Sequence, residues 1–388
     1  MELKNRANRL LARSIEVLRL LCFENGAIIA APTSHASCNH IWEALGTPPL
    51  TPEASGYHRV WVRDGTYIAM ALDAIGDHDR SRRFYEWCMQ VQDPSGCWLQ
   101  CYLPDGRRAI DGLEMDEVGT PIFGAINHYL VTRDNGFLSK AWPMTKRAAA
   151  FLTQNLASNG LMNPSYDLWE ERWGHHLYSN VAAAAGLLSA SYHAEVCGER
   201  SQIEDWRNAS EVLKKSIFEK FLLSEKGSFA RSIDPVDSNI DVSVLSLVFP
   251  FSLLPPKDIR IQRTVEEIEA KLVKGKGVMR YSGDKYDGIP EHHPWRETEG
   301  NLWVPATLWL ALYYIKARQR RKARRLYNWV VKSATDDFLL PQQVDKNGRP
   351  ISAIPYGLAH ALFILTTLQF GEPYSSSKAV SEPQQTHH

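Results

Sequence analysis

The sequence has no excess of charge of either sign, since 44 Lys and Arg residues balance 44 Asp and Glu residues over 388 positions. A general nucleic-acid-binding surface needs a basic excess, so we expect no nucleic-acid partner. No stretch approaches the roughly 20 apolar residues of a membrane span. The first residues also lack the apolar run and the small-residue cleavage site of a signal peptide. We therefore expect no membrane partner and a cytoplasmic location.

Cysteine is scarce, with six residues in the chain, and their spacing matches no metal-ligand pattern. Cys97 and Cys101 are close enough in sequence to pair, but free thiols in a reducing compartment are the better expectation. The adjacent His292 and His293 suggest a metal, yet no matching set of Cys or His ligands lies near them. We expect neither a metal nor a cofactor.

Helical periodicity is what the sequence has in abundance. A first helix carries one apolar stripe, formed by Leu10, Leu11, Ile15, Leu18 and Leu21. A pattern of helix, short turn and helix then recurs over residues 66–92, 117–156, 177–222 and 304–334, and a last helix covers 356–370. The first helix and a pair over 241–250 and 264–273 complete about six helical hairpins.

Long loops rich in Pro, Gly, Trp, Asp and Glu separate these hairpins, and long loops in a compact domain are usually functional. No linker-like change of composition divides the chain. The sequence therefore predicts one all-α domain over residues 1–372, a toroid of helix pairs with its working loops at one end. Residues 373–388 are predicted to form a disordered tail.

The stretch "GYHRVWVRDGTY" is the first candidate for chemistry, with Tyr57, Trp61, Arg63 and Asp64. An Arg–Asp pair beside a Trp is, taken alone, more often a structural ion pair at the start of a helix. The functional alternative is a sugar clamp. In a clamp, the carboxylate accepts from sugar hydroxyls, the guanidinium donates, and an aromatic ring covers the apolar face of the sugar.

The stretch "YDLWEERWG" is the second candidate, with Asp167, Trp169, Glu170 and Glu171. Adjacent acids usually form a solvated face, but these lie among aromatic residues. A carboxyl group in an aromatic pocket has its pKa raised, because desolvation disfavours the charged form. A general acid needs such a pKa near neutral pH.

The third stretch is "RYSGDKYDGIPEHHPWRETEGNLW", with Arg280, Tyr281, Asp284, Tyr286 and Trp303. The fourth is "LLPQQVDKNGRP", an apparently exposed turn with Gln342 and Gln343. His360 lies on an apolar helix after that turn. A lone His in such a place is more often a satisfied core residue than a catalytic one, so we assign it no role.

Together the motifs "ENGAIIAAPTS", "YHRVWVRD", "DLWEE", "RYSGDKYDG…NLWVPATLWLALYYI" and "LPQQVDKNGRPISAIPYGLAHALF" resemble those of glucoamylase-like glycoside hydrolases, family 15. The resemblance covers roughly residues 10 to 370. It implies an (α/α)6 barrel and an inverting attack on the non-reducing α-glucosyl end of an oligosaccharide or α-glucan. The β-sandwich that often precedes the barrel in prokaryotic members is not expected here.

The resemblance also implies roles for individual residues. Glu170 matches the general acid, and Glu171 matches a substrate-binding carboxylate. The remaining matches are substrate contacts: Trp61, Arg63 and Asp64 as the clamp, Tyr57 as its aromatic cover, Arg280 as a hydroxyl donor, Trp169 and Trp303 as walls. Asp116, in "LEMDEVG", matches an acidic turn more weakly.

The sequence departs from the family at the catalytic base. The family has Glu–Gln where this chain has Gln342–Gln343, so an amide occupies the general-base position. An amide cannot take the proton from the attacking water. The family pattern is also interrupted by "IPEHHPWRETEG", an insertion that would lie near the leaving-group subsites and favour short substrates.

Four interpretations of Gln342 stay open. The favoured one is a base-disabled form of an active inverting α-glucosidase, because a change from Glu to Gln is isosteric and affects only the base. The second is a replacement base, from Asp287, Glu291 or Glu297. The third is an inverting phosphorylase, whose phosphate would need no base and would be neutralised by His292, His293, Arg296 and Lys346. The fourth is a non-catalytic, glycan-binding barrel.

Overall fold

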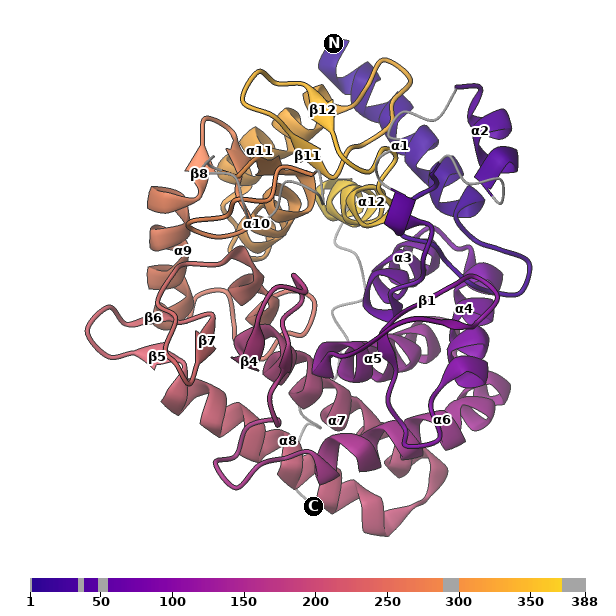
Figure 1. The fold of residues 1–388 in the computed structure, drawn as a ribbon, viewed down its shortest axis with the longest axis vertical. Helices are drawn as coiled ribbons and strands as arrows, with labels where there is room; N and C mark the ends of the chain where they lie inside the picture. The colour runs from indigo at the N-terminus through magenta and orange to yellow at the C-terminus, as the bar shows by residue number, and fades with distance from the viewer. Residues whose placement is uncertain (1, 34–37, 48–54, 289–299, 372–388) are drawn as a thin grey trace.

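The computed structural model describes residues 2–33, 38–47, 55–288 and 300–371. The insertion at 289–299 and the predicted tail at 373–388 lie outside the described residues. The chain forms a ring of helices (Figure 1). The α-helices are α1 (Glu2–Leu20), α2 (Asn39–Leu45), α3 (Val62–Ala74), α4 (His78–Val91), α5 (Met115–Thr132), α6 (Asn135–Gln154), α7 (Leu177–Cys197), α8 (Arg200–Lys220), α9 (Ile259–Lys271), α10 (Val304–Lys316), α11 (Arg320–Ser333) and α12 (Gly357–Gly371).

The helices form two concentric layers. The inner layer runs in the order α3, α5, α7, η3, α10, α12 and back to α3, where η3 (Val242–Leu247) is a short 3-10 helix. The outer layer consists of α4, α6, α8, α9, α11 and α1, which pack on these inner elements (Figure 1). The predicted (α/α)6 toroid is therefore confirmed. The helical pair expected over 241–250 and 264–273 is present with one difference. Its second member is the α-helix α9, whereas its first member is the short 3-10 helix η3.

The division into layers follows from the distribution of apolar residues. The inner helix α7 is buried over nearly its whole length, with only a few exposed positions near its end. The outer helix α11 buries one stripe, Ala323, Leu326, Tyr327, Val330 and Val331, and exposes its arginines. A helix that is apolar all round belongs inside, whereas an amphipathic helix covers a core.

The ring is closed by the first and last helices. The helix α12 packs on α1, α3 and α10. Within this contact, His360 Nδ1 lies 2.8 Å from Ser14 Oγ, and His360 Nε2 accepts a hydrogen bond from the Leu340 N–H at 2.9 Å. Burial lowers the pKa of His360 to about 3. His360 is thus a hydrogen-bonded core residue.

The inner helices α5 and α7 approach each other through glycines. A Cβ atom on Gly119 would lie 2.3 Å from the carbonyl oxygen of Ala182, and one on Gly186 would lie 2.7 Å from that of Gly119. Real Cβ atoms do not come so close to backbone atoms, so these positions accept only glycine at this separation.

Short strands line the loops at one end of the ring. They are β1 (Leu99–Tyr102) with β2 (Arg108–Leu113), β5 (Leu222–Leu223) with β6 (Ser228–Phe229), β3 (Ser165–Tyr166) and β4 (Trp173–His176) with β7 (Ser232–Ile233), and a five-stranded sheet in the order β12-β11-β10-β9-β8. Its strands are β8 (Val273–Lys274), β9 (Gly277–Val278), β10 (Leu302–Trp303), β11 (Gln343–Val344) and β12 (Pro350–Ile351). No helix among the described residues is long and apolar enough to cross a membrane.

Candidate active site

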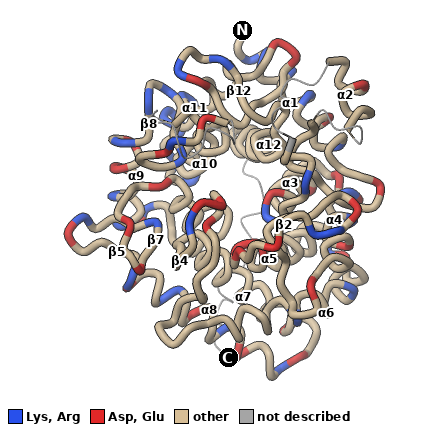
Figure 2. Tube along the Cα trace, in the orientation of Figure 1, with Lys and Arg blue, Asp and Glu red and all other residues tan. Residues whose placement is uncertain are grey.

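A cavity of about 540 Å³ lies among the loops at this end of the ring. Its lining includes the predicted general acid, the residue at the base position and the predicted substrate contacts: Tyr57, Trp61, Arg63, Asp64, Trp169, Glu170, Glu171, Arg280, Trp303 and Gln342. Acidic and basic positions meet beside the centre of the ring, near β4, α3 and α5 (Figure 2). The size is typical of a site for a small ligand.

Glu170 lies in the tight loop between β3 and β4. Asp167 shapes this loop, because its Oδ1 accepts hydrogen bonds from the backbone N–H of Glu171 at 2.8 Å and of Arg172 at 3.1 Å. The loop is closed by a hydrogen bond from the Asp167 N–H to the Arg172 carbonyl at 2.9 Å. Glu170 itself has a φ of 62°, a conformation that costs a non-glycine residue energy and is concentrated at functional sites.

The Glu170 carboxyl group is partly buried in the cavity wall. Burial raises its pKa, while the nearby Arg63 charge and hydrogen bonds from Trp61 and Gln100 partly oppose the increase. The Trp61 bond runs from Nε1 to Oε1 of Glu170. A carboxyl group with a raised pKa keeps its proton longer as the pH rises, which is the property a general acid requires.

The neighbouring Glu171 is held differently, as a partner of cations. Arg280 Nη2 donates to its Oε1 at 2.8 Å, and Arg172 Nη1 donates to its Oε2 at 3.0 Å. Arg280 is fixed in turn by two hydrogen bonds to Asp284, at 2.8 and 2.7 Å. Its guanidinium lies 5.0 Å from the ring of Trp169 and 4.6 Å from that of Trp303. The pair is therefore rigid and faces the cavity within an aromatic box.

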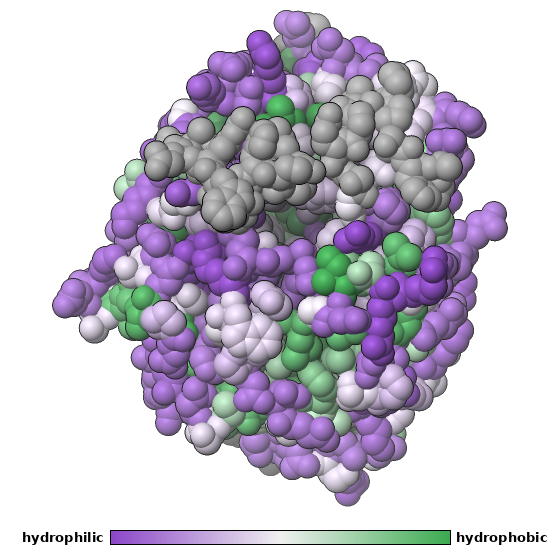
Figure 3. All heavy atoms as spheres, in the orientation of Figure 1, coloured by the Kyte–Doolittle hydropathy of each residue, from purple (hydrophilic) through white to green (hydrophobic). Residues whose placement is uncertain are grey.

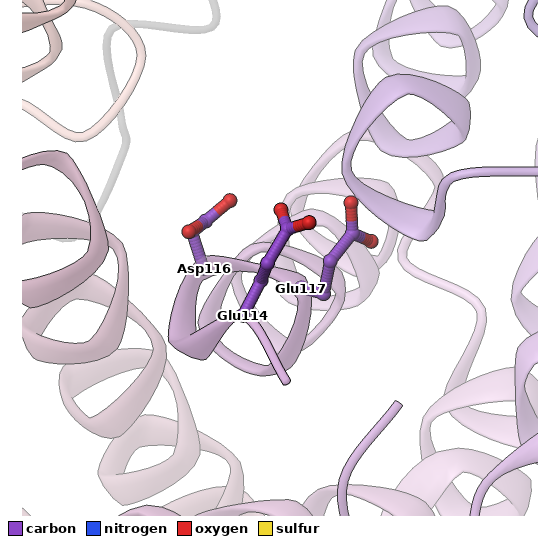
Figure 4. A group of neighbouring side chains, drawn as sticks. All are labelled: Glu114, Asp116 and Glu117. Atoms are coloured by element: carbon purple, nitrogen blue, oxygen red, sulfur yellow. The ribbon is translucent and has the colours of Figure 1, made fainter. Parts of the chain in front are cut away.

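Arg63 sits in a cage of three carboxyl groups. Its Nη1 lies 2.6 Å from Glu114 Oε2, 2.5 Å from Asp116 Oδ2 and 3.2 Å from Glu117 Oε1. Its backbone N–H also donates to Glu117 Oε2 at 2.7 Å. The three acids come from the start of α5 (Figure 4) and are fully buried. The cage fixes the side chain of Arg63 at the cavity wall.

The same three carboxylates have the spacing of a metal site, since one oxygen from each lies within 4.8 Å of the others. The Arg63 guanidinium already supplies positive charge to this cluster. One guanidinium cannot balance three buried negative charges. Burial accordingly raises the pKa of both Glu114 and Glu117 well above the ordinary value, although Arg63 opposes this increase. The burial of Glu114 and Glu117 thus favours their protonated forms, while Arg63 favours their charged forms.

Gln342 lies on another wall of the cavity and is 2% exposed. Its Oε1 accepts from Ser352 Oγ at 2.8 Å and from Gln343 Nε2 at 3.2 Å. Its Nε2 donates to Tyr57 Oη at 2.9 Å. The predicted exposed turn is thus wrong for its first part, because Gln342 and Gln343 are buried and only the tip from Lys346 to Arg349 is exposed. Sheet pairing of Gln343 with Trp303 and Ile351 explains the difference.

Two cavity residues were not anticipated from the sequence. Gln100 on β1 donates to Glu170, and the hydroxyl of Tyr356 bonds both Asp64 and Gln342. Of these two residues, only Tyr356 carried a signal, since it immediately precedes an apolar helix in a stretch rich in Gly and Pro. Tyr286, which the sequence did single out, also lines the cavity, and its hydroxyl lies 3.2 Å from that of Tyr57.

The alternative bases and phosphate ligands are not gathered at the cavity among the described residues. Lys346 is exposed on the turn between β11 and β12 and does not line the cavity. Asp287 is likewise not part of the cavity lining. Glu291, Glu297, His292, His293 and Arg296 lie outside the described residues.

Comparison with known proteins agrees with this geometry. The family model described as glycosyl hydrolases family 15 matches residues 5–95 and 90–385. The chain belongs to glycosyl hydrolases family 15. This family 15 chain is 34% identical over 376 residues to an uncharacterised glycosyl hydrolase of Methanocaldococcus jannaschii, an alignment that covers 93% of the chain and 56% of that protein.

Two further family 15 similarities are informative. The chain is 23% identical over 391 residues to trehalase 2 of Sulfolobus acidocaldarius, covering 93% of the chain and 63% of that enzyme. It therefore spans little more than half the length of these curated relatives. The fold matches the crystal structure of a bacterial glucoamylase complexed with acarbose with a TM-score of 0.75 and 23% identity, over 95% of the chain and 56% of the glucoamylase.

Proposed function

We propose that this family 15 chain is an exo-acting, inverting α-glucoside hydrolase in a base-disabled form. In this proposal, Glu170 is the general acid and Gln342 stands at the position of the general base. The substrate is a short α-glucan, from which a competent base would release β-glucose at the non-reducing end. The observation that carries the proposal is that Glu170, whose pKa is raised by burial, shares one cavity with a buried Gln342 surrounded by hydrogen-bond donors.

The two residues come from opposite sides of the ring. Glu170 lies in the loop before α7, whereas Gln342 lies in the segment before α12. In the inner layer, α7 and α12 are separated by two elements in either direction around the ring (Figure 1). An inverting glycosidase needs an acid and a base on opposite sides of the scissile bond, roughly 6.5–9.5 Å apart, with room for a water. The positions of Glu170 and Gln342 on opposite walls of the cavity suit that requirement.

The surroundings of Gln342 suit a carboxylate. Ser352 Oγ and Gln343 Nε2 already donate to its Oε1. Tyr57, which now accepts from Nε2, could rotate its O–H to donate to a second carboxylate oxygen. A glutamate here would thus receive three or more hydrogen bonds, which offset the cost of burying its charge.

The cavity also suits recognition of a chain end. Arg63 and Asp64 are buried at its wall and bear polar groups that can exchange hydrogen bonds with sugar hydroxyls. Aromatic rings of Tyr57, Trp61 and Trp303 offer apolar faces beside them. A closed arrangement of this kind binds a terminal sugar better than the middle of a polymer.

One observation favours a second candidate, a non-catalytic glycan-binding barrel. The Gln342 amide satisfies both of its polar ends, with Nε2 donating and Oε1 accepting. An amide that fits so completely is compatible with a site that binds glycans without turnover. Glu170 favours the hydrolase, because a binding protein has no need of an acid with a raised pKa.

A proton NMR time course separates the candidates. Maltotriose, isomaltose and trehalose are incubated, each with and without phosphate, with the present chain and with Gln342→Glu. We expect Gln342→Glu to release β-glucose roughly 10²–10⁴ times faster than the present chain, which is the usual contribution of a general base. Gln343→Glu is the matched control, since it places the same charge on the adjacent buried residue that does not line the cavity.

The remaining outcomes are equally informative. Glu170→Gln in the Gln342→Glu background should abolish the gain, because the leaving group would lose its proton donor. Release of glucose 1-phosphate would indicate a phosphorylase. Broadened sugar resonances with no turnover by any variant would refute the hydrolase and leave the glycan-binding barrel.

A further inference from the structure

The hairpin that carries Glu170 and Glu171 also carries two exposed aromatic side chains. Tyr166 on β3 is 38% exposed and Trp173 on β4 is 59% exposed. They are direct cross-strand partners, and their ring centroids lie 5.3 Å apart at an interplanar angle of 81°. The pair therefore stands immediately outside the loop from Asp167 to Arg172.

Their exposure is unusual in this molecule. Among the described residues, the other large apolar side chains that are exposed are aliphatic: Ile110, Val131, Val196, Val212, Val236 and Ile259. Single exposed aliphatic residues are normal at a protein surface and need no explanation. Tyr166 and Trp173 differ, because they are aromatic, contact each other and share a hairpin with the candidate catalytic loop.

The pair lies on the hairpin whose loop, at Leu168 to Glu171, lines the cavity. Figure 1 places β4 inside the ring of helices, on the side from which β1 and β12 are also seen. Figure 3 shows the same face as spheres, with a hollow near its centre. Ile110 on β2 lines the cavity, is 36% exposed, and belongs to a strand that contacts β3. The rim beside the acid is thus apolar.

The role of a general acid indicates which part of the substrate would lie beside this hairpin. A general acid protonates the oxygen of the leaving group, so its loop must face the leaving-group part of the substrate. The strands β3 and β4 continue the hairpin on either side of the loop that holds the acid. A sugar chain that leaves the cavity past Glu170 and Glu171 would therefore run along the hairpin that bears Tyr166 and Trp173.

We propose that Tyr166 and Trp173 form an outer sugar platform, which binds the third glucose unit of a linear α-glucan by contact with its apolar face. The inference rests on the proposed function. It deepens that function by naming the substrate class, oligosaccharides of three or more units. A disaccharide such as trehalose ends inside the cavity and gains nothing from the platform. The aromatic rings are suited to this contact because they are large, rigid and apolar.

The test compares binding by chain length, so that turnover is not required. Isothermal titration calorimetry measures Kd for the di-, tri- and tetrasaccharides of the α-1,4 and α-1,6 series. The proteins are the present chain, Trp173→Ala, Trp173→Phe and Ile259→Ala. The last is the matched control, since Ile259 is 58% exposed at the start of α9. Because Trp173 is exposed, its removal should leave the fold intact, which circular dichroism checks.

We expect Trp173→Ala to raise Kd for tri- and tetrasaccharides by about three- to tenfold, as the loss of one aromatic contact would. Its Kd for the disaccharides should stay within about twofold of the parent, on the same reasoning. Trp173→Phe should restore most of the loss, and Ile259→Ala should change nothing.

Three results would overturn the platform. An unchanged Kd at every chain length would show that Trp173 contacts no sugar. An equal loss for disaccharides and longer chains would show that Trp173 only supports the loop of Glu170. Either result leaves the proposed function standing, provided that the parent binds glucans. If the parent binds no glucan of any length, both the platform and the proposed function fail.

Discussion

Replacing Glu114 with Gln tests whether the cage around Arg63 stores a proton. A buried carboxyl group with a raised pKa binds a proton in the folded state that the unfolded chain has already released. The contribution of this group to the free energy of unfolding is fully present below the pKa of the unfolded chain, near the ordinary 4.5. It is lost as the pH rises toward the higher pKa of the folded state. Glu114→Gln replaces the protonated acid with a neutral group of the same shape, and so removes this dependence.

The magnitude follows from the linkage relation. One such group changes the free energy of unfolding by about 1.4 kcal/mol per pH unit while its folded form stays protonated. Between pH 5.5 and 7.5 the parent should therefore lose stability relative to Glu114→Gln as the pH rises, by at most this slope. The difference in free energy of unfolding between the two proteins should shift in favour of the variant across this range.

Urea denaturation at pH 5.5, 6.5 and 7.5 measures the effect, with Glu211→Gln as the control. Glu211 is an exposed acid on α8, so this variant makes the same Glu-to-Gln substitution without touching the cage. The control should keep the slope of the parent. The reasoning is refuted if the free energy of unfolding of Glu114→Gln falls with pH as steeply as that of the parent, whether or not the variant is less stable by a constant amount. That result would mean that Glu114 is an ionised partner of Arg63.

Three further predictions concern the site and its support. In the Gln342→Glu background, Gln100→Leu should move the alkaline limb of the pH–rate profile to higher pH, because a donor that lowers the pKa of Glu170 is removed; an unmoved limb would exclude Glu170 as the acid. Asp167→Ala should cost about 1–2 kcal/mol in thermal denaturation, because two backbone N–H groups of the catalytic loop lose their acceptor, and should also lower turnover; full activity would show that the loop keeps its shape unaided. Gly119→Ala should lower the free energy of unfolding by about 1–3 kcal/mol or more, because the added Cβ overpacks against α7. The control Gly371→Ala should be tolerated, since no neighbouring atom lies within 4 Å. Equal stability of the two variants would contradict the close approach of α5 and α7.

The helix pairs could be predicted because their apolar residues follow the helical period over long segments, as in α1 and α11. The 3-10 helix η3 could not, since a run such as "VSVLSL" has no period that separates one short helix type from another. The candidate site was predicted where chemistry-bearing residues stand together in sequence, as Glu170 and Glu171 do. The resemblance to a family then placed them in one cavity.

Contacts between distant segments account for what sequence reasoning missed. Gln100 on β1 contacts Glu170 in the loop between β3 and β4, and no local sequence pattern predicts this contact. The cage did leave a signal, since Glu114 and Glu117 are three residues apart, a spacing that puts both on one face at the start of a helix. Nothing in the sequence indicated that their partner would be Arg63, about fifty residues earlier, or that Glu170 would have a positive φ.

The closure of the ring by α12 against α1 has a consequence for how the protein is made. The ribosome releases α1 before the other helices of the ring, yet its packing partner α12 and the acceptors of its Arg6, on Val331 and Ala334, are synthesised more than 300 residues later. At roughly 5–20 residues per second, the apolar stripe of α1 waits for tens of seconds without its native cover. We therefore expect nascent chains to depend on chaperones throughout that interval, and truncation before α12 to yield aggregated protein rather than a smaller, open ring.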